Sequence, residues 1–180
     1  MAWQGAKHNR QAEQQEMAEV LTRSAERVQM LLRAAEMTAE SLERLARAPR
    51  LNGDSLRPAL NQALAAFEQR PELSYMGLVV PETGEYGNIE RTAQGDLLLW
   101  LFPGTRPRDP VTRRYKLANG DFVLQDERPT DGYDPRVRPF YQAAVRGPAQ
   151  GLWLPAYEWV VHVGGTGSLW GLSYVKALRD

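Results

Sequence analysis

The sequence predicts an α+β fold in which two helices precede an antiparallel β-sheet of about five strands, with the helices on one face. Residues 11–47 contain no glycine or proline and are rich in helix-forming residues. A second helical pattern follows over residues 54–70. From residue 73 onward the helical period gives way to the alternation and short apolar runs that are typical of strands.

Composition limits the domain count and the classes of partner. A chain of 180 residues with 43% hydrophobic residues can bury one ordinary core and carry a helical extension. The 22 basic and 22 acidic residues balance, so no overall field attracts nucleic acid. The chain has no cysteine, which excludes disulfides and thiolate nucleophiles. We therefore expect one globular domain and no nucleic-acid partner.

The first helix is predicted to end before Pro49. A helix of about 35 residues spans roughly 50 Å, which is longer than a small domain. We expect its C-terminal part to pack on its own domain and its N-terminal part to form a homodimer contact. The stripe that would make these contacts has heptad spacing. It consists of Met17, Leu21, Ser24, Val28, Leu31, Ala35, Thr38, Leu42 and Leu45.

A second helix is predicted to start at Asp54 or Ser55, either of which can cap it, and to end near Pro71. Its apolar face consists of Leu56, Leu60, Leu64 and Phe67. Strands are then predicted, of which residues 96–102 are almost entirely apolar and should be buried on both faces. The predicted strands are 73–80, the segment up to residue 90, 96–102, 114–117, 122–125, 152–163 and 169–178, the last two joined by a hairpin loop at 164–168.

Two prolines dictate the shape of residues 134–141, which read Asp-Pro-Arg-Val-Arg-Pro-Phe-Tyr. A residue before proline avoids the α region, so Asp134 and Arg138 should be extended. Pro139 suits the first position of a helix, which should stop at Gly147. If the approach to this helix is extended, Arg136 and Arg138 project to the same side.

The segment has the chemistry of an anion site. A guanidinium matches a carboxylate through two parallel hydrogen bonds, and the start of a helix adds partial positive charge. The aromatic side chains that could form the walls are Tyr133, Phe140, Tyr141, Trp153, Tyr157 and Trp159. Each of these residues has a structural alternative: the arginines can hold the loop through Asp131 or Asp134, and the aromatic residues can be core or sheet-packing residues.

At these residues the sequence resembles the Cache superfamily. The resemblance rests on residues 134–141 and on residues 153–157, Trp-Leu-Pro-Ala-Tyr. It implies a PAS-like sheet in the extracytoplasmic, periplasmic part of an inner-membrane receptor, such as a chemoreceptor, histidine kinase or nucleotide cyclase. Members of the superfamily bind amino acids, organic acids or amines.

The amino-acid-binding branch of this superfamily implies particular site residues. Tyr133, Arg138 and Tyr141 match its tyrosine, arginine and second tyrosine, whereas Phe140 replaces a tryptophan and lacks its N–H donor. The branch also has an aspartate on its last strand, which would lie beyond Asp180. The resemblance therefore supports the carboxylate half of an amino-acid site more strongly than the ammonium half.

These observations lead to one expectation with two alternatives. Residues 1–50 would be a signalling and dimerisation helix, and residues 51–180 a sensing domain that needs no cofactor or metal and is not an enzyme. No apolar run approaches the roughly 18–20 residues of a membrane span, so the anchor of the parent receptor would lie outside this sequence. The alternatives are a ligand-free dimerisation module and, more distantly, a small hydrolase. The predicted ligand-binding residues are Tyr133, Arg136, Arg138, Phe140, Tyr141, Trp153 and Tyr157.

Catalysis is disfavoured by the residue types present. The only histidines are His8 and His162, which lie in the first helix and in a predicted strand. They form neither a two-histidine metal site nor a histidine-supported triad. Asp131 and Asp134 lie beside arginines that favour their ionised forms, which suits ion pairing better than proton transfer.

Overall fold

The computed structural model describes residues 2–47, 51–105, 110–159 and 169–178. These residues belong to two compact units, Met1–Ala35 and Glu36–Asp180. Helix α1 (Ala2–Arg47) supplies the first unit and begins nearer the N-terminus than residue 11. In this unit the stripe residues Met17, Leu21, Val28 and Leu31 are all exposed. The predicted loop at residues 164–168 and His162 lie outside the described residues.

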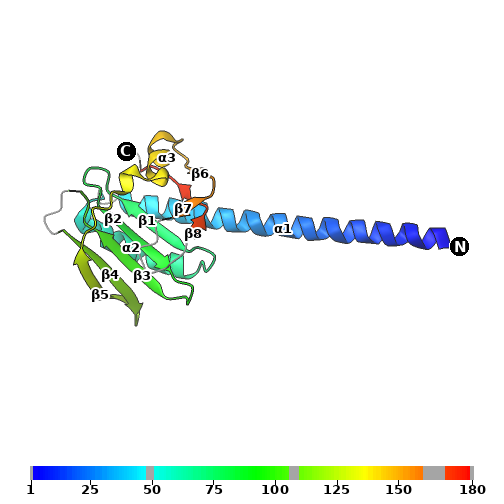
Figure 1. The fold of residues 1–180 in the computed structure, drawn as a ribbon, viewed down its shortest axis with the longest axis horizontal. Helices are drawn as coiled ribbons and strands as arrows, with labels where there is room; N and C mark the ends of the chain where they lie inside the picture. The colour runs from blue at the N-terminus through cyan, green and yellow to red at the C-terminus, as the bar shows by residue number, and fades with distance from the viewer. Residues whose placement is uncertain (1, 48–50, 106–109, 160–168, 179–180) are drawn as a thin grey trace. The chain divides into compact units, whose positions relative to one another are not determined.

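The second unit confirms the predicted α+β fold (Figure 1). Its five-stranded sheet is antiparallel throughout, and the strands lie side by side in chain order. The strands β4 and β5 are longer than the sequence predicted. The strands are β1 (Tyr75–Val79), β2 (Tyr86–Arg91), β3 (Leu97–Phe102), β4 (Val111–Ala118) and β5 (Asp121–Pro129).

Helix α2 (Gly53–Glu68) begins one or two residues before the predicted start and has a different cap. Asn52 is the N-cap: its side chain accepts a hydrogen bond from the Ser55 backbone N–H at 2.9 Å, and its own N–H donates to the Ser55 hydroxyl at 2.8 Å. This reciprocal pair is a capping box, in which Ser55 is the third helical residue. The prediction of Asp54 or Ser55 as the cap was therefore wrong.

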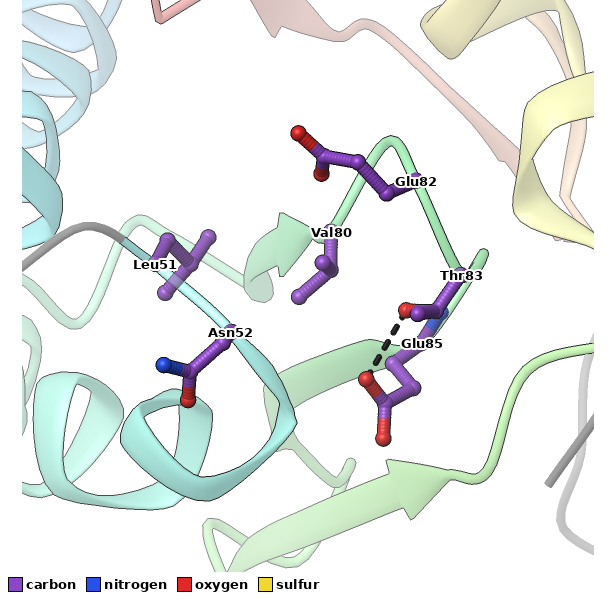
Figure 2. Close-up of a pocket in the computed structure, with 6 residues that line it drawn as sticks. All are labelled: Leu51, Asn52, Val80, Glu82, Thr83 and Glu85. Atoms are coloured by element: carbon purple, nitrogen blue, oxygen red, sulfur yellow. Dashed lines mark hydrogen bonds between the residues drawn. The ribbon is translucent and has the colours of Figure 1, made fainter. Parts of the chain in front are cut away.

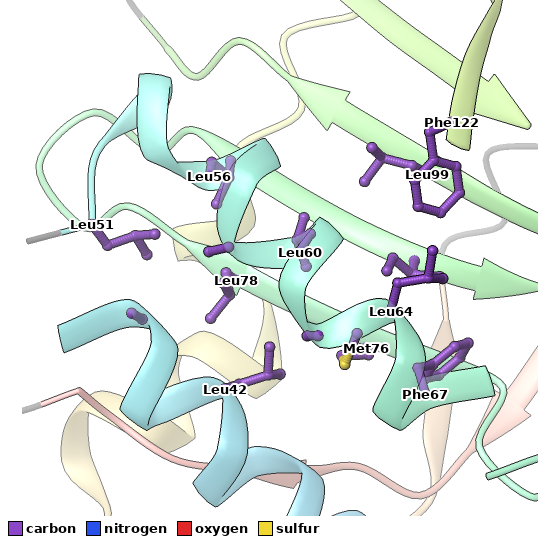
Figure 3. Close-up of a cluster of buried hydrophobic side chains, with 14 of the residues drawn as sticks. Leu42, Leu51, Leu56, Leu60, Leu64, Phe67, Met76, Leu78, Leu99 and Phe122 are labelled. Atoms are coloured by element: carbon purple, nitrogen blue, oxygen red, sulfur yellow. The ribbon is translucent and has the colours of Figure 1, made fainter. Parts of the chain in front are cut away.

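One face of the sheet carries the main hydrophobic core (Figure 3). The predicted apolar face of α2 is buried there, with Leu60 and Phe67 at 0% exposure. Burying a side chain of this size stabilises a fold by about 1.5–3 kcal/mol. Gly87 lets α2 approach β2 closely, since a Cβ there would lie 2.7 Å from Leu60 Cδ1. The last turns of α1 join this core through Leu42 and Ala46.

The opposite face carries a smaller aromatic cluster. Tyr86, Leu98, Trp100 and Phe102 are buried there and are covered by Tyr133 and Phe140, which follow the sheet in sequence. Strand β3 therefore contributes buried side chains to both faces, as its apolar sequence predicted. This second face is the one that positions the predicted ligand-binding residues.

The C-terminal hairpin differs from the two long strands that the sequence predicted. Four short strands take their place: β6 (Leu152–Trp153), β7 (Tyr157–Trp159), β8 (Leu169–Gly171) and β9 (Tyr174–Val175). The pairs β6–β9 and β7–β8 are antiparallel and form ladders separate from the five-stranded sheet. Pro155, which has no N–H to donate, lies where the first predicted strand is interrupted.

Two polar contacts within the second unit connect this hairpin to the last turns of α1. The Trp153 indole N–H donates to the Glu36 carboxylate at 2.9 Å. Lys176 forms an ion pair with Glu43 at 2.7 Å, and these two side chains are only 15% and 14% exposed. Because the ion pair is shielded from solvent, removing either partner would leave the other charge buried without compensation.

Candidate ligand-binding site

The two prolines shape residues 134–147 largely as predicted. Asp134 (φ −113°, ψ 108°) and Arg138 (φ −82°, ψ 151°) are extended, and helix α3 (Pro139–Arg146) begins at the second proline and ends before Gly147. Between them, however, residues Pro135–Val137 form a 3₁₀ turn, which the Asp134 side chain caps by accepting from the Arg136 N–H at 3.0 Å. The extended approach assumed for this segment was therefore wrong, and with it the reason for placing both arginines on the same side.

Arg136 is held by protein acceptors. Its guanidinium donates to both carboxylate oxygens of Asp134, at 3.0 and 3.1 Å, and to the Thr105 hydroxyl at 2.9 Å. It also donates to the backbone carbonyls of Pro81 and Glu82, at 3.3 and 3.4 Å. The Arg136 guanidinium also keeps the pKa of the Asp134 carboxyl below its usual value. Since a guanidinium has five N–H groups, Arg136 has no donor left for a ligand.

Arg138 has no such acceptors. Its half-buried guanidinium makes no side-chain hydrogen bond or ion pair with any part of the chain that the structure describes. It lies close enough to the Tyr133 hydroxyl to act on its ionisation. Burial raises the pKa of Tyr133 to about 12, against the opposing effect of Arg138. The structure thus gives the two arginines different roles, and only Arg138 has free donors.

The aromatic residues that follow β5 lie directly on the sheet. The ring centroids of Tyr133 and Phe102 are 5.2 Å apart, and those of Tyr86 and both Tyr133 and Phe140 are 6.0 Å apart. Such distances are typical of favourable aromatic contacts. The segment around Arg138 is therefore fixed against β2 and β3.

Four tyrosine hydroxyls come together at this face. Those of Tyr75, Tyr86, Tyr133 and Tyr157 lie close enough to influence one another's ionisation. Tyr86 reaches across Gly77 of β1, where a Cβ would lie 2.9 Å from the Tyr86 hydroxyl oxygen. Burial raises the pKa values of Tyr75 and Tyr86 well above the ordinary value. The hydroxyls of Tyr75, Tyr86 and Tyr133 therefore stay protonated at neutral pH and can donate hydrogen bonds.

Strand β2 adds two polar side chains to the same face as Tyr86, because alternate strand residues share a face. Asn88 is fully buried, and neither its amide nitrogen nor its amide oxygen has a hydrogen-bond partner. Glu90 accepts a hydrogen bond from the Trp100 indole N–H at 3.1 Å. The Trp159 indole N–H, on a ring 5.6 Å from that of Tyr75, is likewise buried without a partner.

Three further predicted residues lie around this cluster rather than in a single pocket. Tyr157 is one of the four tyrosines, and its hydroxyl lies 3.1 Å from that of Ser173. Trp153 contacts α1 through Glu36, and Tyr141 lies on α3 near Arg136. The predicted residues that the structure brings together are therefore Tyr133, Arg138, Phe140 and Tyr157.

Sequence reasoning missed the contribution of the sheet. The residues concerned come from β1, β2 and β3, and they are Tyr75, Tyr86, Asn88, Glu90 and Trp100. One signal was available, because asparagine is disfavoured in strands and Asn88 lies in a strand that the structure buries. The face on which it lies, however, depends on the register of β2.

A surface pocket of about 300 Å³ lies elsewhere, near the start of α2 and the β1–β2 turn (Figure 2). Its lining includes Glu82, Thr83 and Glu85, and the Thr83 hydroxyl donates to the Glu85 carboxylate at 2.8 Å. The Glu85 carboxylate lies beside Gly53, the first residue of α2, where a negative charge stabilises the helix. We therefore assign Glu85 a structural role.

The described residues lack two kinds of feature. They contain no cluster of three or more histidine, cysteine or acidic side chains arranged to hold a metal ion. None of their helices combines the length and apolarity needed to cross a membrane.

We expect Arg136→Ala to lower the free energy of unfolding by about 1–3 kcal/mol, because it leaves Asp134 and two carbonyls without their donor. Arg138→Ala should change it by less than about 0.5 kcal/mol, since that guanidinium holds no protein group. Urea unfolding of both variants measures the difference. Equal losses of stability would contradict the roles assigned to the two arginines.

Glu90 should make stability depend on pH. Burial raises the pKa of its carboxyl, against the hydrogen bond from Trp100. The folded protein therefore favours the protonated form, so the contribution of Glu90 to stability is present below the ordinary glutamate pKa and is lost as pH rises through the folded value. Glu90→Gln stays neutral and keeps an oxygen acceptor.

We accordingly expect Glu90→Gln to be more stable than the unsubstituted protein at about pH 7, and the difference to shrink as pH falls toward about 4. Urea midpoints at a series of pH values provide the measurement. A difference that does not change with pH would show that burial of Glu90 has no effect on its ionisation.

Comparison of this chain with models of known families, with curated proteins and with solved structures found no match. The resemblance to the Cache superfamily therefore rests on the residues quoted for it, and the function that it implies stays a prediction.

Proposed function

We propose that this chain is the extracytoplasmic sensor domain of a bacterial signal-transduction receptor of the Cache type. It binds a small carboxylate-bearing ligand, such as an amino acid or an organic acid, between the segment 133–141 and the sheet. The observation that carries the proposal is the Arg138 guanidinium, which is half-buried beside the Tyr133 hydroxyl and has no side-chain partner among the described residues.

The chemistry around Arg138 favours a carboxylate. A guanidinium can form two parallel hydrogen bonds to a carboxylate, and these charge-assisted bonds are roughly twice as strong as neutral ones. Burial keeps the hydroxyls of Tyr75, Tyr86 and Tyr133 protonated, so they add neutral donors. An anion in this place would meet one positive charge and several donors on a surface largely shielded from water.

The same features favour binding over catalysis. Strongly raised tyrosine pKa values leave the hydroxyls poor bases and poor nucleophiles at neutral pH. Glu90 already accepts from Trp100, and Asp134 is engaged by Arg136. The acidic and hydroxyl groups around Arg138 are thus suited to recognition, and we propose no reaction for this site.

Within the second unit, a chain of contacts connects residues 133–141 to α1 and could carry a signal. Helix α3 packs against β9, β9 pairs with β6, and Trp153 of β6 donates to Glu36 of α1. The Lys176–Glu43 ion pair lies beside this path. A ligand that binds one position of α3 better than another would shift the population of that position, and the hairpin would transmit the shift to α1.

A screen of amino acids and organic acids by thermal shift tests the proposal. A ligand at 100 times its dissociation constant stabilises the folded state by about 2.7 kcal/mol. We expect at least one carboxylate to raise Tm, and Arg138→Ala to abolish the shift. Arg146→Ala, an exposed arginine at the other end of α3, is the matched control and should retain it. Shifts that persist in Arg138→Ala would exclude this arginine as the anion-binding group.

We further propose that α1 forms a homodimer contact with a second copy of the chain. The exposed residues Met17, Leu21, Val28 and Leu31 repeat with heptad spacing, and a heptad stripe is complementary to the same stripe on another copy. If no ligand binds, this contact would be the main function of the chain, as a protein-contact module. The parent receptor would be anchored in the membrane by segments outside the described residues.

Leu21→Glu combined with Val28→Glu should convert the dimer to a monomer, because two charges per chain would face each other across the seam. Met30→Glu is the control, since Met30 is equally exposed but lies off the stripe. Sedimentation velocity measures the mass of each variant. A monomeric unsubstituted protein, or a double variant that remains dimeric, would refute the contact.

A further inference from the structure

Asn88 is a polar side chain of the sheet whose burial no described contact explains. It lies in the middle of β2 at 0% exposure, and both hydrogen-bonding atoms of its carboxamide lack a partner. A buried amide without partners destabilises the folded state, whereas an apolar side chain of similar size would not. No group of the described residues therefore pairs with this amide.

The neighbours of Asn88 leave its amide on the ligand-facing side. Its Cα partners are Gly77 on β1 and Trp100 on β3. Gly77 has no side chain to cover the amide, and Tyr86 reaches over that glycine with its hydroxyl. Asn88 thus lies beside the tyrosine hydroxyls, on the opposite face from α2.

We propose that Asn88 selects the ligand, by pairing with a group that both accepts and donates a hydrogen bond, such as a carboxamide or a hydroxyl. This inference rests on the proposed function, because the same ligand binds Arg138 with its carboxylate. The amide nitrogen of Asn88 donates to the ligand group and the amide oxygen accepts from it. The unpartnered indole N–H of Trp159 provides a further donor in the same cluster.

The register of β2 sets the length of the ligand. Tyr133, next to Arg138, packs over Tyr86, and Asn88 is two residues further along the strand. At about 3.3 Å per residue, Tyr86 and Asn88 are roughly 6–7 Å apart along the strand, and we take this as the spacing between the two polar ends of the ligand. A short carbon chain with a carboxylate at one end and the second polar group at the other spans this distance. A ligand lacking the second group would leave Asn88 unpaired and bind more weakly.

Two probes of matched shape test the inference: glutarate monoamide, which has the second polar group, and 5-methylhexanoate, in which two methyl groups replace the amide oxygen and nitrogen. Isothermal titration calorimetry should show that the unsubstituted protein binds the monoamide at least about 10-fold more tightly. Asn88→Leu should lose this preference. Because the variant has no unpaired amide, its ligand-free form should have a Tm at least about 2–4 °C above that of the unsubstituted protein. Asn88→Ala is the second variant if leucine prevents folding.

The control is Asn52→Leu, since the Asn52 carboxamide is already paired with the Ser55 N–H. It should lower Tm and keep the preference for the monoamide. If the Asn88 variants keep the preference, or if the unsubstituted protein binds neither probe or both equally, the inference is wrong. Arg138→Ala separates the two proposals: carboxylate binding that needs Arg138 but not Asn88 would retain the sensor function and refute only the role of Asn88.

Discussion

The candidate site depends on the hydrogen bonds of Arg136. This guanidinium connects its own turn, through Asp134, to the β1–β2 turn and to Thr105 after β3. These three places are far apart in the chain, and one rigid, planar donor group holds them together. The position of Tyr133 on the sheet, and that of Arg138 beside it, follow from this attachment. In the proposed site, Arg136 would therefore act indirectly, by fixing the segment that carries Arg138.

The candidate site also depends on the face of the sheet that residues 133–141 cover, because this face is shielded from water. Aromatic rings from β1, β2 and β3 and from the segment itself shield the tyrosine hydroxyls, which raises their pKa values. The low polarity of these surroundings strengthens hydrogen bonds that are made and penalises those that are not. Asn88 and Arg138 therefore stand out for the same reason: each offers donors that no described protein group uses.

The C-terminal hairpin connects α3 to the last turns of α1. It is built from short strands that pair only with each other among the described residues, and it contacts both α3 and the last turns of α1. Trp153 illustrates the consequence: predicted as a wall of the pocket, it donates instead to Glu36 of α1. A side chain in that position is better placed to transmit a shift of the hairpin than to contact a ligand.

The sequence by itself determined the elements whose causes are local. The glycine-free and proline-free run gave α1, the apolar spacing of Leu56, Leu60 and Phe67 gave the buried face of α2, and Pro139 gave the start of α3. Tertiary structure decided which arginine is free, because the acceptors of Arg136 come from Pro81, Glu82 and Thr105. Tertiary structure also decided which sheet residues belong to the candidate site, since strand register alone places Tyr75, Asn88 and Trp100 on one face. Backbone preferences act between neighbours in the chain, whereas hydrogen-bond partners and burial depend on residues that only folding brings together.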